Sequence, residues 1–472
     1  MMTILIRSLH KVIILLILAL PLQSQSDITG SWHGLLKIQS LQLRLVFHIK
    51  SEDGSLKATM DSPDQGTIDI TVDQISYEEN QLKLSVKSAG ISYEGVFGSD
   101  HIVKGIFMQG PYTFPLDLTK NIPEKEIITK PQDPIKPYPY MSEDIFFENK
   151  KAGITLAGTL TIPFEDRQYP VVILISGSGP QNRDSELLGH RPFLVLSDYL
   201  TRNGIAVLRF DDRGTSSSKG NFQSATSADF ASDVEAGIEY LKTRKEINKA
   251  SIGLIGHSEG GLIAPLVASN SKDVAFIVLL AGPGIPGDQI LLLQQELIGR
   301  VTGVSESDMA KSKKDNEACF SIIKKAEDES KVKAELIQYI TQMLENDPNP
   351  QLPAGMTKER FIATQVSQLT SSWMQFFLTY DPQPALSKVK CPILALNGEK
   401  DLQVPPKENL TAIKKGLKKA KNKYVTIKEL PGLNHLFQES ATGNPNEYAL
   451  IQQTFSPLAM EEVLQWIQLW VK

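Results

Sequence analysis

The chain has 472 residues, more than a single hydrophobic core usually organises, which predicts two or three domains. Its composition, 41% hydrophobic and 22% charged, is ordinary for a globular protein. The formal net charge of −5 argues against a nucleic-acid-binding protein.

A basic and then apolar segment opens the chain. Arg7 and Lys11 precede the apolar run 12–20, and small or polar residues follow at 23–26. This order predicts a signal peptide over residues 1–26, removed on export to the periplasm or the medium. An uncleaved anchor is the alternative, although the run is short for a membrane span. No later segment is apolar enough to cross a membrane, so no stable anchor is expected after cleavage.

Residues 27–120 have the pattern of a small all-β domain. The runs 41–49 and 81–86 alternate apolar and polar residues, and turn-forming residues separate such runs. We expect seven or eight short strands in a barrel or sandwich. Its aromatic residues are expected to fill the core, with a glycan-binding or dimerising face as the alternative. These residues are Trp32, Tyr93, Phe97, Phe107 and Tyr112.

A proline-rich linker is expected next, over residues 121–141. It contains five prolines, at positions 123, 131, 134, 137 and 139, which favour extended and semi-rigid backbone.

Residues 142–472 alternate strands with helices. Most of the strands are continuously apolar, as in a parallel sheet covered by helices on both faces. The pattern predicts a doubly wound α/β sheet of about eight strands. The expected strands are 144–147, 154–162, 171–175, 206–210, 251–255, 276–281, 392–397 and 424–430, and the helices are 187–203, 229–244, 262–270, 410–420 and 458–471.

Residues 285–385 interrupt this alternation with helices alone. The expected helices are 289–300, 309–325, 331–345, 358–369 and 373–380. The segment leaves the sheet at its carboxyl edge, where ligands of open α/β sheets bind, so it is expected to form a lid. The two cysteines, Cys319 and Cys391, are too few for a disulfide framework and are expected to be free and buried.

The most informative motif is Gly256-His257-Ser258-Glu259-Gly260, which reads G-x-S-x-G. It lies between an expected strand and an expected helix, the context of a nucleophile elbow. The sharp turn there lifts the serine hydroxyl above the sheet and leaves no room for side chains at the flanking positions. Ser258 is therefore the candidate nucleophile.

A serine nucleophile needs a base, and the base needs a carboxylate that orients it. The α/β-hydrolase chain order is serine, acid, histidine, and His435 is the only histidine after Ser258. It follows the last expected core strand. Asp401, which follows the preceding strand, is the candidate acid, and Glu399 is the alternative.

The developing oxyanion needs backbone N–H donors. One is expected from Glu259 and the other from Ser178, with Gly179 as the alternative. The glycine-rich loop 176–180 lacks the patterns of nucleotide-binding loops, so nucleotide binding is not expected.

For four other features we expect a structural role rather than a catalytic or ligand-binding one. The Glu259 side chain is expected to be solvated or ion-paired, and His257 to pack beside the elbow, with a direct proton role as the alternative. Arg213 is expected to form an ion pair that fixes its loop, with substrate binding as the alternative. The lysines at 414, 415, 418, 419, 421 and 423 are expected on a solvated face rather than at a polyanion site.

Together these residues resemble secreted bacterial α/β-hydrolases of the esterase type, with a serine-aminopeptidase-like hydrolase domain. The resemblance covers residues 142–472, and the motifs 30–34 and 107–110 resemble the β module that such proteins carry. It rests on residues 174–184, 210–214, 256–261, 396–401, 432–435 and 373–382.

The resemblance implies carboxylic-ester hydrolysis by Ser258, Asp401 and His435, on a small acyl ester and without metal or cofactor. A peptidase of the same fold is one alternative. The other is a vestigial hydrolase that binds glycans.

Overall fold

The structure, a computed structural model, describes residues 27–471 apart from 39–40, 66, 111, 126–128, 166, 326–327, 349, 351 and 353–355. The predicted signal peptide, residues 1–26, lies outside the described residues. Contacts divide the chain into two compact units, and the main division falls between Glu124 and Lys125, inside the expected linker. No helix among the described residues is long and apolar enough to span a bilayer.

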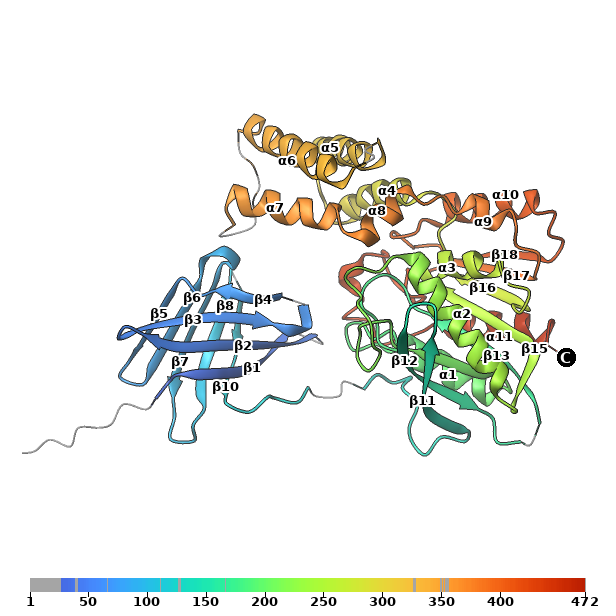
Figure 1. The fold of residues 1–472 in the computed structure, drawn as a ribbon, viewed down its shortest axis with the longest axis horizontal. Helices are drawn as coiled ribbons and strands as arrows, with labels where there is room; N and C mark the ends of the chain where they lie inside the picture. The colour runs from blue at the N-terminus through green and yellow to red at the C-terminus, as the bar shows by residue number, and fades with distance from the viewer. Residues whose placement is uncertain are drawn as a thin grey trace, which may run out of the picture. The chain divides into compact units, whose positions relative to one another are not determined.

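The first unit is a curved antiparallel sheet (Figure 1). Its two edge strands, β4 and β5, follow each other in the chain. Val72, between them, donates its N–H to Ala58 in β3, and Asp73 donates to Ser85 in β6. The two edges are thus joined, as in a small barrel. The sheet order is β4-β3-β2-β1-β10-β8-β7-β6-β5, with β9 on β8.

The ten strands outnumber the expected seven or eight because the sequence pattern does not mark the short β9 and β10. Their bounds are β1 Gly30–Ile38, β2 Leu41–Glu52, β3 Ser55–Ser62, β4 Thr67–Thr71, β5 Gln74–Glu78, β6 Gln81–Val86, β7 Ile91–Phe97, β8 Val103–Gln109, β9 Tyr112–Pro115 and β10 Leu118–Thr119.

Aromatic side chains fill most of this unit's interior, as predicted. Trp32, Tyr93 and Phe107 are buried, and Phe97 packs edge-to-face on Trp32. Tyr112 is 67% exposed, so the expectation that it lies in the core is wrong. It belongs to β9, which pairs only with β8 and lies off the main strand order.

The second unit contains an eight-stranded sheet, with strands at the predicted positions. The order is β11-β12-β14-β13-β15-β16-β17-β18; β12 pairs antiparallel with both β11 and β14, and the pairs from β14 onward are parallel. The bounds are β11 Met141–Asn149, β12 Ile154–Ile162, β13 Tyr169–Ile175, β14 Ala206–Phe210, β15 Ile247–His257, β16 Phe276–Leu280, β17 Ile393–Gly398 and β18 Val425–Leu430.

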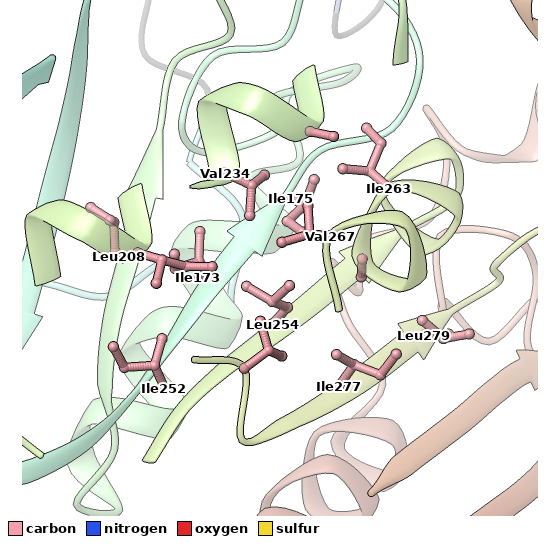
Figure 2. Close-up of a cluster of buried hydrophobic side chains, with 14 of the residues drawn as sticks. Ile173, Ile175, Leu208, Val234, Ile252, Leu254, Ile263, Val267, Ile277 and Leu279 are labelled. Carbon is pink, nitrogen blue, oxygen red and sulfur yellow. The ribbon is translucent and has the colours of Figure 1, made fainter. Parts of the chain in front are cut away.

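Helices cover both faces of this sheet. On one face, Val234 of α2 and Ile263 of α3 pack on strand residues such as Ile173 and Leu254 (Figure 2). Helix α10 joins this face, while α1 and α11 cover the other. The lysines of and after α10 are mostly exposed, as predicted. The bounds are α1 Pro192–Arg202, α2 Ser227–Thr243, α3 Glu259–Ala268, α10 Pro406–Lys419 and α11 Pro457–Gln468.

The start of α1 differs from the prediction. The helix was expected from Leu187 but begins at Pro192, whose ring suits a first helical turn. Leu188 and Gly189 have φ values of 52° and 78°, which a helix cannot accommodate. Leu187 and His190 form a short bridge instead. Residues 185–190 are therefore a tight turn.

The segment between β16 and β17 folds as helices close to the predicted ones, coloured yellow to orange in Figure 1. Phe320, Leu336 and Leu378 lie in its small apolar core. Cys319 is buried there and Cys391 is partly buried at the sheet, and both are free. The helices are α4 Gly287–Val301, α5 Glu306–Lys325, α6 Glu329–Asn346, α7 Lys358–Leu369, α8 Ser372–Thr379 and α9 Gln383–Leu386.

Within the second unit, part of the proline-rich segment is bound to the hydrolase fold. The Gln132 side chain accepts from the N–H groups of Thr454 (2.6 Å) and Phe455 (3.0 Å) and donates to the Phe455 carbonyl (2.7 Å). Asp133 pairs with Arg191 at 2.6 Å, and Lys130 donates to the Ile451 carbonyl. These contacts fix residues 130–133 to the loop that precedes α11.

Replacing Gln132 with alanine is expected to lower the free energy of unfolding by about 1–3 kcal/mol, because backbone groups of Thr454 and Phe455 lose their partners. Urea unfolding followed by tryptophan fluorescence measures the change. Gln223→Ala, at an exposed loop position, is the matched control. Equal stability of the two variants would contradict the expectation.

Candidate active site

The turn from β15 into α3 has the geometry of a nucleophile elbow. Ser258 has φ 52° and ψ −120°, in the positive-φ region that side chains rarely adopt. A Cβ atom on Gly256 would lie 2.0 Å from the Gly260 carbonyl oxygen, and one on Gly260 would lie 2.2 Å from the Ile175 carbonyl oxygen. Only glycine fits at these two positions, which explains the spacing of the motif.

Asp401 and His435 are in direct contact. His435 Nδ1 lies 2.8 Å from Asp401 Oδ2, and both side chains are buried. The other carboxylate oxygen, Oδ1, accepts the N–H groups of Gln403 and Val404, each at 2.8 Å. A carboxylate held in this way accepts the Nδ1–H of the imidazole and leaves Nε2 unprotonated.

Two loops at the carboxyl edge of the sheet bring this pair together. Gly398, at the end of β17, lies so close to the His435 loop that a Cβ there would be 2.2 Å from the Leu433 carbonyl oxygen. Lys400 donates its N–H to that same carbonyl. Asn434, fully buried, accepts the N–H groups of Leu436 and Gln438 and so shapes the turn that carries His435.

Glu399, the alternative acid, does not contact His435. Its exposed carboxylate accepts the Gly432 N–H at 2.8 Å and so fastens the neighbouring loop. The geometry favours Asp401 over Glu399 as the partner of the imidazole.

Ser258 and His435 line one cavity of about 110 Å³. The tight turn before α1 supplies part of its wall. His190 there is buried, with its ring nitrogens 3.0 Å from Thr454 Oγ1 and the Tyr448 carbonyl oxygen. The remaining lining residues are Gly177, Ser178, Gln181, Ser185, Leu187, Pro192, His257, Gln403, Leu436 and Thr454.

The loop after β13 approaches the elbow closely. A Cβ on Gly177 would lie 3.2 Å from Ser258 Cβ, and Ser178 lines the cavity next to it. Gly179, the alternative donor, is not among the described residues that line the cavity. Glu259 is the first residue of α3, where backbone N–H groups lack helical partners. Of the two expected donors, Ser178 thus lines the same cavity as Ser258, and Glu259 directly follows Ser258 in the chain.

A buried carboxyl holds this loop. Asp212 accepts the Ser176 hydroxyl at 2.7 Å and the Gln181 N–H at 2.9 Å, on either side of Gly177 and Ser178 in the chain. Burial, with a smaller contribution from the nearby Glu259, raises the pKa of Asp212 to about 8, although its hydrogen bonds act to lower it. Asp212 is therefore largely protonated at neutral pH.

Asp212→Asn is expected to change how stability depends on pH. The raised pKa of Asp212 means that its stabilising contribution is complete below its ordinary value of 3.8 and is lost as pH rises through about 8. Asparagine does not titrate, so between pH 5 and 8 the variant should gain roughly 1–4 kcal/mol relative to wild type. Urea unfolding across this range measures the gain. Parallel stability curves for the variant and wild type would contradict it.

His257 packs beside the elbow. Its Nε2–H donates to the His435 carbonyl oxygen at 2.9 Å. Burial, the charge of His435 and a weaker opposing hydrogen bond bring the pKa of His257 to about 3. A ring that stays neutral and donates to backbone is suited to holding the His435 loop rather than to moving a proton.

The expectation for the Glu259 side chain is wrong. It is 3% exposed, so it is not solvated, and no ion pair involves it among the described residues. It accepts hydrogen bonds from Ser227 and Trp373 instead. Arg213, by contrast, forms a buried ion pair with Asp233 of α2, 2.7 Å long, as predicted for a residue that fixes its loop.

Several residues near the site were given no individual role in the sequence interpretation. They are Asp212, His190, Gln403, Thr454 and Trp373. Asp212 had a usable signal, since paired aspartates directly follow the apolar strand β14. The others reach the site from distant loops and from the insertion, where neither periodicity nor spacing marks them.

The doubly wound sheet, the elbow and the histidine–aspartate pair define the class of α/β hydrolases. Residues 152–429 match the X-Pro dipeptidyl-peptidase (S15) family. Because this match covers more than half of the chain, the chain belongs to that family.

Proteins similar to this chain in sequence or in structure include esterases. Esterase EstD of Thermotoga maritima is 27% identical over 165 residues, and the match spans 34% of this chain and 39% of EstD. An esterase of Pyrococcus furiosus is similar at 17% identity and a TM-score of 0.43, over 74% of this chain and 100% of that one. The α/β hydrolase GrgF from Penicillium is similar at 14% identity and a TM-score of 0.43, over 70% and 99%.

Proposed function

We propose that the protein is a serine hydrolase that cleaves small carboxylic esters. The observation that carries the proposal is the 2.8 Å contact between Asp401 and His435, with His435 and Ser258 on one cavity. A serine and a histidine on one cavity, with an aspartate bound to the histidine, can perform acyl transfer through a covalent intermediate.

In the proposed reaction, His435 Nε2 takes the proton of the Ser258 hydroxyl as its oxygen attacks the ester carbonyl. Asp401 stabilises the imidazolium that forms. His435 then gives the proton to the leaving alcohol, and an acyl-enzyme remains on Ser258. Water attacks this intermediate with His435 again as base, which releases the acid.

The tetrahedral intermediates carry an oxyanion. We assign its stabilisation to the backbone N–H groups of Glu259, which follows the nucleophile, and of Ser178, which lines the same cavity. Donors fixed before the reaction are effective because they need no reorganisation as charge develops. The Asp212 carboxyl supports this arrangement, since it holds Ser176 and Gln181 on either side of the loop donor.

The size and lining of the cavity favour a substrate with a small, uncharged acyl group. Its volume of about 110 Å³ accommodates a small acyl group such as acetyl or propionyl. None of the described lining residues is acidic. A substrate with a free ammonium group would therefore lack a carboxylate partner in this cavity.

A dipeptidyl peptidase that releases X-Pro dipeptides is the second candidate, and the family membership favours it. Such a substrate presents both a free ammonium group and an acyl part several times larger than acetyl. The size and lining of the cavity favour the ester, which is why we rank it first.

A substrate series separates the two candidates. We expect p-nitrophenyl acetate and propionate to be hydrolysed at least about tenfold faster, by kcat/KM, than the octanoate, and glycyl-prolyl-p-nitroanilide to be resistant. A preference for the anilide would replace the esterase by the peptidase. A fluorophosphonate probe should label Ser258, whereas absence of both labelling and turnover would indicate a vestigial, binding function.

Two further proposals concern the context of the site. The helical insertion leaves the sheet at the edge that carries Ser258, and we propose that it acts as a lid.

We also propose export, on the signal-peptide pattern of residues 1–26. N-terminal sequencing of the protein from the periplasm or medium should find a start near residue 27; an intact N-terminus there would contradict cleavage.

A further inference from the structure

One oxygen of the Glu259 carboxyl joins three segments that are far apart in the chain. Glu259 Oε1 accepts the Ser227 hydroxyl at 2.5 Å and the Trp373 indole N–H at 2.8 Å. Ser227 is the first residue of α2, and Trp373 lies in insertion helix α8. Glu259 itself directly follows the nucleophile.

The burial of the Glu259 carboxyl group lowers the stability of the fold. Glu259 is 3% exposed, burial raises its pKa, and among the described residues no lysine, arginine or histidine pairs with it. An apolar side chain of similar size would avoid the desolvation of a carboxyl group. Local rules of this kind are broken chiefly where a site requires it.

The backbone of Glu259 has its own task in the proposed reaction, because its N–H is one of the two oxyanion donors. Ser258 holds a strained conformation, which persists only where surrounding contacts maintain it. Hydrogen bonds that anchor the Glu259 side chain limit the rotation of the whole residue. The side chain can therefore control the alignment of its own N–H.

Trp373 lies where both ends of the insertion meet. Its ring stacks on Phe377 with centroids 5.1 Å apart and planes 10° apart. The Phe377 carbonyl oxygen would lie 2.1 Å from a Cβ on Gly287, so α8 packs directly on the start of α4. A movement of the insertion as a body would move the indole N–H relative to Glu259.

We propose that Glu259 is a positioning residue that couples the helical insertion to the nucleophile elbow through Trp373. With the insertion seated, the Trp373 N–H and the Ser227 hydroxyl hold Glu259 so that its backbone N–H points at the reacting carbonyl. With the insertion displaced, one of the two restraints is lost and the donor is misaligned. This inference rests on the proposed ester hydrolysis.

The test removes the coupling from each side. Trp373→Phe keeps an aromatic ring for the stack on Phe377 and removes the N–H donor together with part of the indole. It should lower kcat on p-nitrophenyl acetate about 10- to 100-fold with KM within about threefold. Glu259→Ala should lower kcat at least as much. The double variant should be no slower than Glu259→Ala alone, because both changes remove one interaction.

Two variants serve as controls. Trp470→Phe makes the same chemical change where the indole N–H has no partner among the described residues, and its kcat should stay within about twofold of wild type. Glu259→Gln keeps an acceptor oxygen for both donors and should keep most of the activity. If Glu259→Ala does not fold, Glu259→Gln and Trp373→Phe still test the proposal.

Each other outcome overturns the inference. A folded Trp373→Phe protein with wild-type kcat would remove the coupling, and a rise in KM alone would make Trp373 a substrate contact. If the fold-losses in kcat of the two single variants multiply in the double variant, the two residues act independently. A wild-type protein that neither turns over esters nor reacts with a fluorophosphonate would instead refute the proposed function.

Discussion

Ser258→Ala is expected to lower kcat on p-nitrophenyl acetate by about 10⁵-fold or more, because the variant cannot form the acyl-enzyme. The substitution removes only the hydroxyl. The backbone N–H groups proposed as oxyanion donors stay in place, as do Asp401 and His435. Any remaining turnover measures what they contribute without a nucleophile.

The matched control is Ser269→Ala, at the far end of α3 from the elbow. Its activity should stay close to that of wild type. Burst kinetics and fluorophosphonate labelling should both vanish in Ser258→Ala and persist in the control. Retained turnover in Ser258→Ala would remove the nucleophile from this position and end the proposed mechanism.

Asp401→Asn is expected to lower kcat by about 10⁴-fold with little loss of stability. Asp401 Oδ1 accepts two backbone N–H groups, from Gln403 and Val404. In the variant the amide oxygen must take that position, so its NH₂ faces His435 Nδ1. The imidazole then carries its proton on Nε2 and cannot accept one from Ser258.

Glu399→Gln separates the two candidate acids. Glu399 is exposed and fastens Gly432, and the amide oxygen of the introduced glutamine can accept the same N–H, so activity within about threefold of wild type is expected. If Asp401→Asn kept wild-type activity and Glu399→Gln lost it, Glu399 would be the residue that orients His435. Activity and urea unfolding of both variants give the answer.

The elements of the second unit could be predicted because their signals are local. Buried parallel strands are continuously apolar, and the elbow requires glycine on both sides of Ser258. The chain order of serine, acid and histidine then selected Asp401 and His435. These residues follow β17 and β18, and the carboxyl ends of parallel strands lie at one edge.

The failures have a different origin. Leu187 looked helical by composition, but the positive φ values at Leu188 and Gly189 end any helix there. Glu259 looked solvated because its partners, Ser227 and Trp373, lie 32 and 114 residues away. The short β9 and β10 carry too few residues for a period-two pattern, so Tyr112 was assigned to the wrong environment.

The docking of residues 130–133 determines where the second unit can be cut out as an independent fragment. Sequence pattern alone suggests starting at Ser142, where strand β11 is under way. A fragment that starts there would lack Gln132, which binds the backbone of Thr454 and Phe455. It would also lack Asp133, the ion-pair partner of Arg191. Expression from Lys130 or earlier keeps these partners, and it also keeps Thr454, beside His190, in the wall of the cavity that Ser258 lines.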